Sequence, residues 1–193
     1  MAIKSQAARN EIYRLKVTLD GMAPPIWRRI EVAGTTTLEE LHFIIQDVMG
    51  WTNSHLHDFA IGRNHISEPA DGPGFDFSPP RNSGEDVAVS QLGLRVKGKL
   101  TYTYDFGDSW THTVLVEAIE HREPKVNYPR CTAGRRACPP EDCGGIWGYA
   151  NMLEALADAK HPSHENMVEW IGTDFDAEAF DLEQVNKMIG TSG

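Results

Sequence analysis

Apolar and polar residues alternate in five stretches of the chain, which predicts β-strands, because successive side chains of a strand point to opposite faces. In the first stretch, Leu15, Val17 and Leu19 fall on one face. The turn-forming segment from Gly21 to Pro25 separates this stretch from the second, which predicts a β-hairpin. The predicted strands are residues 12–19, 27–32, 55–61, 100–106 and 110–120.

Apolar residues recur at helical spacing between residues 38 and 49, which predicts a helix. Thr37 and Glu40 fit a capping box, in which each side chain hydrogen-bonds the backbone N–H of the other residue. Gly50 is expected to end this helix. Three further helices are predicted near the C-terminus, at residues 149–159, 163–172 and 181–190.

The order of these elements is typical of an α+β protein rather than an alternating α/β one. We expect a mixed, mostly antiparallel sheet in the order ββαβ(loop)ββ, β-grasp-like around the early helix, with further helices at the C-terminus. Residues 11–190 are expected to form a single domain after a disordered tail at residues 1–10. Long loops are expected at residues 62–86 and 121–147, where hydrophobic periodicity is lost.

The stretch LTYTYDFGDSWTH, residues 100–112, concentrates residue types that often serve in functional sites. Its Asp-Phe-Gly is not a kinase magnesium motif, because no H-R-D-type catalytic loop and no glycine-rich loop precede it. A strand that ends in a tight turn explains it better. A two-residue turn would place Asp105 opposite Trp110 and diagonal to His112, on one face of the hairpin. A three-residue turn would separate Asp105 from His112.

His55 and His57 are two residues apart on a predicted strand, so their imidazoles would project to the same side and could bind one metal ion. One hypothesis is therefore a metal-dependent hydrolase or nucleic-acid-processing enzyme with a metal-activated water as nucleophile. Its candidate residues are His55, His57, Asp105, Asp108 and His112. The simpler interpretation is that both histidines bond the backbone or a carboxylate such as Asp58 or Asp105.

Three cysteines, Cys131, Cys138 and Cys143, are spaced C-x6-C-x4-C in a loop rich in Pro and Gly. Three thiolates and one histidine would form a closed tetrahedral zinc (Zn) site that holds this loop. The candidate fourth ligands are His112, His121, His161 and His164. The spacing differs from the paired C-x2-C of zinc ribbons, so the alternative is one buried cysteine and two incidental ones.

The chain has 193 residues and a formal net charge of −10, which argues against a large DNA-binding surface, because such a surface needs clustered Lys and Arg. Acidic residues concentrate from Glu141 onward, which indicates a solvated acidic face or a surface that docks a basic partner. Basic residues gather near the N-terminus. A DNA-associated accessory protein would use Arg14, Lys16, Arg28 and Arg29.

No run of residues approaches the ~20 apolar residues needed to cross a membrane, so no membrane partner is expected. The N-terminal segment has no apolar stretch typical of a secretory signal, and the cysteine count of 3 is odd. These features favour the reduced cytoplasm as the location.

Several segments together resemble one protein family. They are PPIWRRIEV, TLEELHFIIQDVMGW, HLHDF, YDFGDSWTH, ACPPEDCGGIWGY, HPSHENMVEWIG and FDAEAFDLEQVN. The series resembles the plasmid Ri open-reading-frame-three-like family, also labelled transposon-passenger proteins of the TnpR type, over residues 12–189. The resemblance implies a mobile-element-associated protein with no established biochemical activity. The TnpR label suggests a resolvase, but this acidic chain has no recognisable helix-turn-helix with a basic recognition helix.

The leading hypothesis is a non-enzymatic binding or interaction module for an unknown protein or small-molecule partner, with a structural zinc at the three cysteines. It rests on the clustered thiols and on the lack of a complete catalytic motif such as G-x-S-x-G, a P-loop or HExxH. The metal-dependent hydrolase and the DNA-associated accessory protein are the alternatives. The hydrolase requires the strand of His55 and His57 to face one pocket with the 100–112 hairpin.

Overall fold

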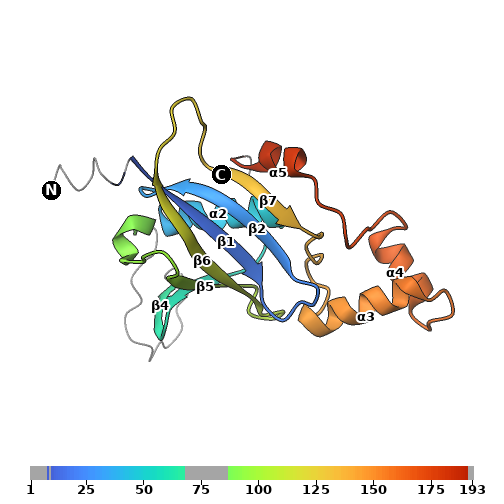
Figure 1. The fold of residues 1–193 in the computed structure, drawn as a ribbon. Helices are drawn as coiled ribbons and strands as arrows, with labels where there is room; N and C mark the ends of the chain where they lie inside the picture. The colour runs from blue at the N-terminus through green and yellow to red at the C-terminus, as the bar shows by residue number, and fades with distance from the viewer. Residues whose placement is uncertain (1–7, 9, 68–86, 191–193) are drawn as a thin grey trace.

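One antiparallel sheet of seven strands forms the centre of the protein (Figure 1). The computed structural model describes residues 8, 10–67 and 87–190. The sheet order is β4-β3-β5-β6-β1-β2-β7, and every strand pairing within these residues is antiparallel. The strands are β1 (Glu11–Leu19), β2 (Ile26–Ala33), β3 (His57–Ile61), β4 (Asn64–Ser67), β5 (Lys99–Tyr104), β6 (Trp110–His121) and β7 (Arg130–Arg135).

The helix α2 (Leu38–Met49) covers one face of the sheet and closes the hydrophobic core (Figure 1). Its N-terminus is the predicted capping box. The Thr37 hydroxyl accepts from the Glu40 N–H at 3.1 Å, and the Glu40 carboxylate accepts from the Thr37 N–H at 2.8 Å. Gly50 ends the helix with a left-handed backbone, φ 86°, which glycine adopts without a steric cost.

The α+β class is confirmed, and two edge strands occupy segments expected to be loops. β4 lies within residues 62–86 and pairs with β3, whereas β7 lies within residues 121–147 and pairs with β2. The loop predictions are wrong there, because short edge strands with few large apolar side chains give a weak alternation signal. The order ββαβ(loop)ββ and the β-grasp-like arrangement are not confirmed. Most of the predicted tail, residues 1–10, lies outside the described residues.

Three helices follow the sheet: α3 (Gly145–Ala157), α4 (His164–Ile171) and α5 (Leu182–Met188). α3 and α4 contact each other and extend beyond one end of the sheet, whereas α5 lies against β7 and α2 (Figure 1). A short 3-10 helix, η2 (Val89–Leu92), precedes β5. None of the helices in the described ranges combines the length and the apolar character of a membrane-spanning segment.

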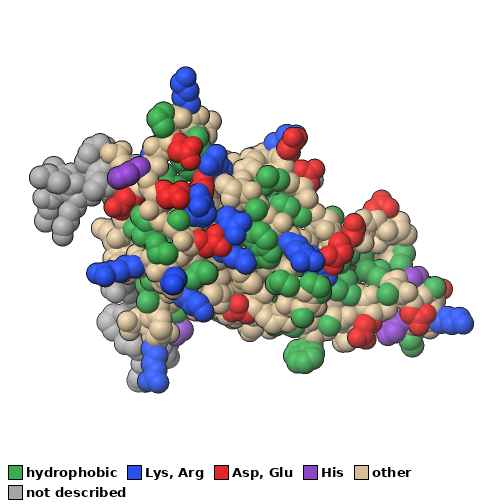
Figure 2. Space-filling model, viewed as in Figure 1, with side chains coloured by type: hydrophobic (Ala, Val, Ile, Leu, Met, Phe, Trp, Pro, Cys, Tyr) green, Lys and Arg blue, Asp and Glu red, His purple; other side chains and the backbone are tan. Residues whose placement is uncertain are grey.

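The sheet face opposite α2 carries paired charges rather than a basic patch. Arg14 bonds the Glu31 carboxylate at 3.0 Å, and Arg29 bonds Glu117 at 3.0 Å. Figure 2 shows positive and negative side chains interspersed over the central face of the molecule. These arginines are therefore committed to carboxylates, which weakens the DNA-associated alternative that would use them.

Arg28 differs from the other basic candidates because its side chain enters the core, where it is 3% exposed. Its guanidinium donates to the Val48 carbonyl at 2.7 Å and to the Arg135 carbonyl at 3.1 Å. It also lies 4.8 Å from the centroid of the Phe180 ring. Burial lowers the pKa of Arg28, and these contacts offset part of the cost of burying its charge. Arg28 thus fixes the end of α2 rather than presenting a charge to a partner.

The outer edge of β7 is closed by a side chain of α5. The Asn186 Oδ1 accepts from the Cys131 N–H at 2.9 Å, and the Asn186 Nδ2 donates to the Cys131 carbonyl at 2.9 Å. The primary amide thus makes the two hydrogen bonds that a neighbouring strand would make. It couples the C-terminal helix to the edge of the sheet.

Replacing Asn186 with Ala is expected to lower the free energy of unfolding by roughly 1–3 kcal/mol, because both backbone groups of Cys131 lose their partner. Urea denaturation measures the change. Gln184→Ala on the same helix is the matched control, since only the backbone N–H of Gln184, and not its side chain, makes a hydrogen bond among the described residues. Equal stability losses in the two variants would contradict the role of Asn186.

Candidate functional site

The turn between β5 and β6 is longer than the two residues expected. Tyr104 pairs with Trp110, so the turn comprises residues 105–109. Trp110 and His112 therefore lie on the buried face with Tyr104, and Asp105 lies outside the strand pairing. The prediction that Asp105, Trp110 and His112 share a face is wrong, because an odd number of turn residues reverses the facing of the second strand.

The backbone of this turn positions the Asp105 carboxylate. Asp105 and Ser109 both have left-handed backbones, each with φ 55°, a region that aspartate enters more readily than most residues. The Asp105 Oδ1 accepts from the Gly107 N–H at 2.8 Å. The Asp105 N–H donates to the Leu56 carbonyl at 2.9 Å, which joins the turn to the loop before β3.

His112 is a core residue. It is fully buried, and its ring lies 5.4 Å from the rings of both Trp51 and Tyr102. Neither ring nitrogen has a hydrogen-bond partner among the described residues. Burial lowers the pKa of His112 to about 4, because the apolar surroundings disfavour the imidazolium. His112 is thus placed for packing and is separated from Asp105.

His57 stacks on His42 of α2, with ring centroids 3.6 Å apart and planes 6° apart. His42 lies 2.8 Å from the Tyr102 hydroxyl and 2.7 Å from the Asn53 side-chain oxygen. Burial lowers the pKa of both histidines to about 4. His55 precedes the first residue of β3, so strand alternation does not place it beside His57, and the two predicted metal ligands have different surroundings.

Three loops, one of which is the β5–β6 turn, meet and form a polar contact region that we call the three-loop junction. The Gly144 N–H donates to the Asp108 carboxylate at 3.1 Å. The Thr52 N–H donates to the Glu141 carboxylate at 3.2 Å. The junction comprises residues 51–56, 105–109 and 138–144.

Tyr104 ties the junction to the sheet. Its hydroxyl donates to the Glu141 carboxylate and accepts from the Ser54 N–H, the latter at 2.9 Å. The Trp51 indole stacks on its ring at 5.0 Å and donates to the Pro139 carbonyl at 3.0 Å. Burial and the Glu141 carboxylate raise the pKa of Tyr104, so the phenol stays a hydrogen-bond donor at neutral pH.

His55, Asp105 and Asp142 converge at the centre of the junction. The His55 Nε2 lies 3.2 Å from the Asp142 Oδ1 and 3.8 Å from the Asp105 Oδ2. This nitrogen is buried, yet it has no hydrogen-bond partner among the described residues, because the approach of Asp142 does not have hydrogen-bond geometry. One ligand atom of each residue lies within 4.8 Å of the others, as a shared metal ion requires. An ion pair with a protonated His55 is the alternative use of this geometry.

The cysteines do not form such a group in the described part of the chain, where the His55 group is the only set of His, Cys, Asp or Glu ligand atoms that converges so closely. Cys131 is buried on β7, and its thiol donates to the Ala133 carbonyl at 3.4 Å. Burial raises the pKa values of Cys138 and Cys143 to about 12, so both are neutral thiols in the metal-free chain at pH 7.

The histidines expected as fourth zinc ligands also have other surroundings. His112 lies in the core, and His121 is exposed at the end of β6. The His161 Nδ1 accepts from a backbone N–H at 3.1 Å, and the His164 Nδ1 lies 2.8 Å from a carbonyl of α3. Zinc at the three cysteines stays a prediction.

Sequence reasoning missed Asp142 and Glu141, which supply two of the carboxylates of the junction. The available signal was a pair of acids, Glu141 and Asp142, in a Pro- and Gly-rich loop directly before Cys143. Their contacts depend on a return of the chain to the β5–β6 turn, which no local pattern reveals.

The fold and the junction define an α+β protein with one antiparallel sheet and a polar meeting point of three loops at its end. Residues 11–184 match the family described as plasmid pRiA4b ORF-3-like protein, and the chain belongs to this family, as the resemblance predicts. It is 39% identical over 181 residues to the uncharacterized protein y4hQ of Sinorhizobium fredii (strain NBRC 101917 / NGR234), covering 92% of this chain and 90% of that protein.

A solved structure has the same fold. The crystal structure of the protein of unknown function MM3350 from Methanosarcina mazei Go1 is similar to this one with a TM-score of 0.81 and 40% sequence identity. The match covers 90% of this chain and 97% of that one. The similarity therefore extends over most of both chains.

The Tyr104–Glu141 contact is expected to show a coupling free energy of about 1–3 kcal/mol in a double-mutant cycle of Tyr104→Phe and Glu141→Gln, because the hydrogen bond is charge-assisted and part-buried. Denaturant unfolding of the four proteins gives the coupling. Tyr128→Phe combined with Glu141→Gln is the control, with no coupling expected. Additive effects of Tyr104→Phe and Glu141→Gln would show that the contact does not tie the junction.

Replacing His112 with Leu is expected to leave stability at pH 7 unchanged or higher, because neither ring nitrogen loses a partner. It should also flatten the acid loss of stability. A histidine with a lowered folded pKa is protonated first in the unfolded chain, so its stability is present above about pH 6.5 and lost as pH falls toward 4.

The loss attributable to His112 is up to about 3 kcal/mol for a shift of this size. Unfolding free energies at pH 7 and pH 4.5 measure it. An equally steep loss in the His112→Leu variant would contradict the assignment, and so would a large loss of stability at pH 7.

Proposed function

We propose that this protein is a binding module organised by a divalent cation at His55, Asp105 and Asp142. The observation that carries the proposal is the buried His55 Nε2, which faces two carboxylate oxygens and has no hydrogen-bond partner among the described residues. A cation between the three groups would satisfy the imidazole lone pair and neutralise the two carboxylates. The plasmid in the family description supports an association with mobile elements.

The donor set indicates the class of ion. One imidazole nitrogen and two carboxylate oxygens suit Zn²⁺ or Mn²⁺ better than a soft monovalent ion. Asp105 and Asp142 both have left-handed backbones, with φ 55° and 59°.

Binding is favoured over catalysis because the residues proposed for a hydrolase do not lie together in one site. His55 and Asp105 would bind the ion, and Asp108 lies in the same junction. His57 and His112 are held in core contacts with other rings. The hydrolase alternative would need a water on the open position of the same ion, with no further histidine of the predicted set beside it.

After removal of metals with chelator, addition of Zn²⁺ or Mn²⁺ is expected to bind with a stoichiometry of one and to raise the melting temperature. A cation at a free concentration of about 100 times its Kd stabilises the folded state by about 2.7 kcal/mol. Titration calorimetry and thermal unfolding measure the two effects. Asp105→Asn and His55→Gln should each weaken binding by about tenfold or more.

His65→Gln is the matched control, because His65 also pairs with an aspartate, Asp58, at 2.6 Å but lies outside the junction. The control should bind the cation as the unchanged chain does. Absence of saturable binding, or equal binding by the His55→Gln variant, would contradict the cation site. The three residues would then be explained by an ion pair with a protonated His55.

A further inference from the structure

A cavity of about 400 Å³ lies between α3 and the turn that joins β1 to β2, which are neighbours in Figure 1. Gly21 allows this close approach, because a Cβ at that position would lie 2.5 Å from the Ile146 Cδ1. Small-molecule sites occupy roughly 300–1,000 Å³. Among the described residues that line the cavity, all side chains are apolar apart from the Arg136 guanidinium and the Tyr149 phenol.

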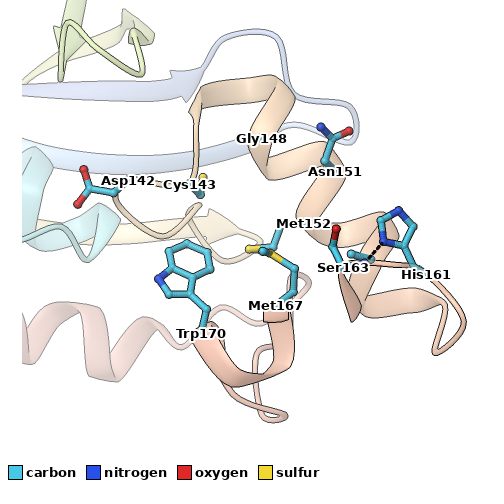
Figure 3. Close-up of a pocket in the computed structure, with 10 residues that line it drawn as sticks. Asp142, Cys143, Gly148, Asn151, Met152, His161, Ser163, Met167 and Trp170 are labelled. Atoms are coloured by element: carbon cyan, nitrogen blue, oxygen red, sulfur yellow. Dashed lines mark hydrogen bonds between the residues drawn. The ribbon is translucent and has the colours of Figure 1, made fainter. Parts of the chain in front are cut away.

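A second cavity, of about 560 Å³, lies on the opposite side of α3, where Met152 meets Met167 of α4 (Figure 3). From α3, the first cavity is lined by residues 146, 147, 149, 150 and 153, and the second by residues 148, 151, 152 and 155. At about 3.6 residues per turn, these two sets fall on opposite faces of the helix. The cavities are therefore separate, and the second one provides control positions.

The phenol of Tyr149 is a hydrogen-bond donor that packing does not explain. The side chain is 1% exposed, and its hydroxyl has no hydrogen-bond partner among the described residues. The ring lies 6.4 Å from the ring of Phe175, edge to face. A phenylalanine would make the same ring contact. Because buried hydroxyls are nearly always hydrogen-bonded in native proteins, this phenol is suited to an acceptor on a ligand.

Arg136 supplies a second donor to the same wall, and it is 5% exposed. Its Nε donates to the Glu178 carboxylate at 2.6 Å and its Nη1 to the Pro24 carbonyl at 2.9 Å, whereas Nη2 makes no hydrogen bond within the described ranges. Burial raises the pKa of Tyr149 to about 12, and the nearby charge of Arg136 opposes that rise. The guanidinium and the phenol are thus neighbours in an otherwise apolar wall.

We propose that this cavity binds a small monocarboxylic acid with an apolar body, such as a medium-chain aliphatic acid. Its carboxylate would accept from the Tyr149 hydroxyl and the Arg136 Nη2, and its chain would lie against Met22, Ile146 and Trp147. Hydrogen bonds from a guanidinium to a carboxylate are charge-assisted and therefore strong. The site shares no residue with the His55 group, so it does not depend on the cation.

The ion pair of Arg136 with Glu178 is the competing explanation of the buried charge. The Glu178 side chain is 60% exposed, so water screens its attraction for the guanidinium. A second carboxylate, enclosed by the cavity, would be screened less. A role limited to the ion pair leaves the Tyr149 hydroxyl unused, whereas the proposed site uses both donors. The two explanations therefore differ in what the loss of that hydroxyl does to ligand binding.

The probe is octanoate, titrated calorimetrically at pH 7 into the chelator-treated chain, so that failure of the cation site does not affect the result. We expect one site per chain. Octan-1-ol, with the same chain and no charge, should bind at least tenfold more weakly, because it loses the charge-assisted hydrogen bonds. From butanoate to octanoate, affinity should rise about fourfold per methylene. Equal affinity for octanoate and octan-1-ol would overturn the proposal.

Tyr149→Phe should weaken octanoate binding about tenfold and leave the melting temperature unchanged or higher, because the hydroxyl loses no partner on folding. Tyr128→Phe, away from the cavity, is the control and should bind as the unchanged chain does. Unchanged octanoate affinity in Tyr149→Phe would contradict the role of the phenol and overturn the proposal.

A matched pair of leucine variants tests the cavity itself and does not touch Tyr149. Ala150→Leu fills part of the cavity and should weaken octanoate binding at least tenfold, whereas Asn151→Leu, on the opposite face of α3, should not. Octanoate should also shift the emission of the 83% exposed Trp147 to shorter wavelength, an effect lost in Trp147→Phe. Equal affinities of the two leucine variants would place the probe elsewhere and overturn the proposal.

Discussion

The five-residue turn between β5 and β6 is the constraint on which the functional end of the molecule depends. It brings Trp110 and His112 to the buried face beside Tyr104. It also releases Asp105 from the strand with a left-handed backbone, so that its carboxylate meets His55. An even-numbered turn would direct Trp110 to the charged face of the sheet, because a slip of one residue reverses every side chain. The packing of the core and the geometry of the site therefore both depend on the register of the β5–β6 hairpin.

A layer of polar groups runs from the core to this turn. The Tyr102 hydroxyl hydrogen-bonds the side chains of both His42 and Gln46 beneath the sheet. Tyr104 continues the layer to Glu141 and the surface loops. Because every step depends on a partner at a fixed distance, the layer specifies one arrangement of the loops more strictly than apolar packing does.

Local chemistry was enough to predict some elements from the sequence and not others. The capping box at Thr37 depends on residues three apart, so it was predicted with its hydrogen bonds. The register of the β5–β6 hairpin depends on positive φ at Asp105 and Ser109. A glycine at such a position would indicate positive φ from the sequence, whereas Asp and Ser do not. Asp142 entered the site only through a long-range return of the chain. β7 has its partners in β2 and α5, and its own residues give little sign of a strand.

The closure of β7 by Asn186 has a consequence for association between molecules. An unpaired edge strand is a template for the same strand of another copy. Because α5 is tethered to the sheet, its amide competes with any second chain at an effective concentration on the order of millimolar. The last helix therefore acts as an intramolecular competitor against edge-to-edge polymerisation. The C-terminal segment, whatever ligand the loops hold, helps to keep the sheet of each molecule separate from that of the next.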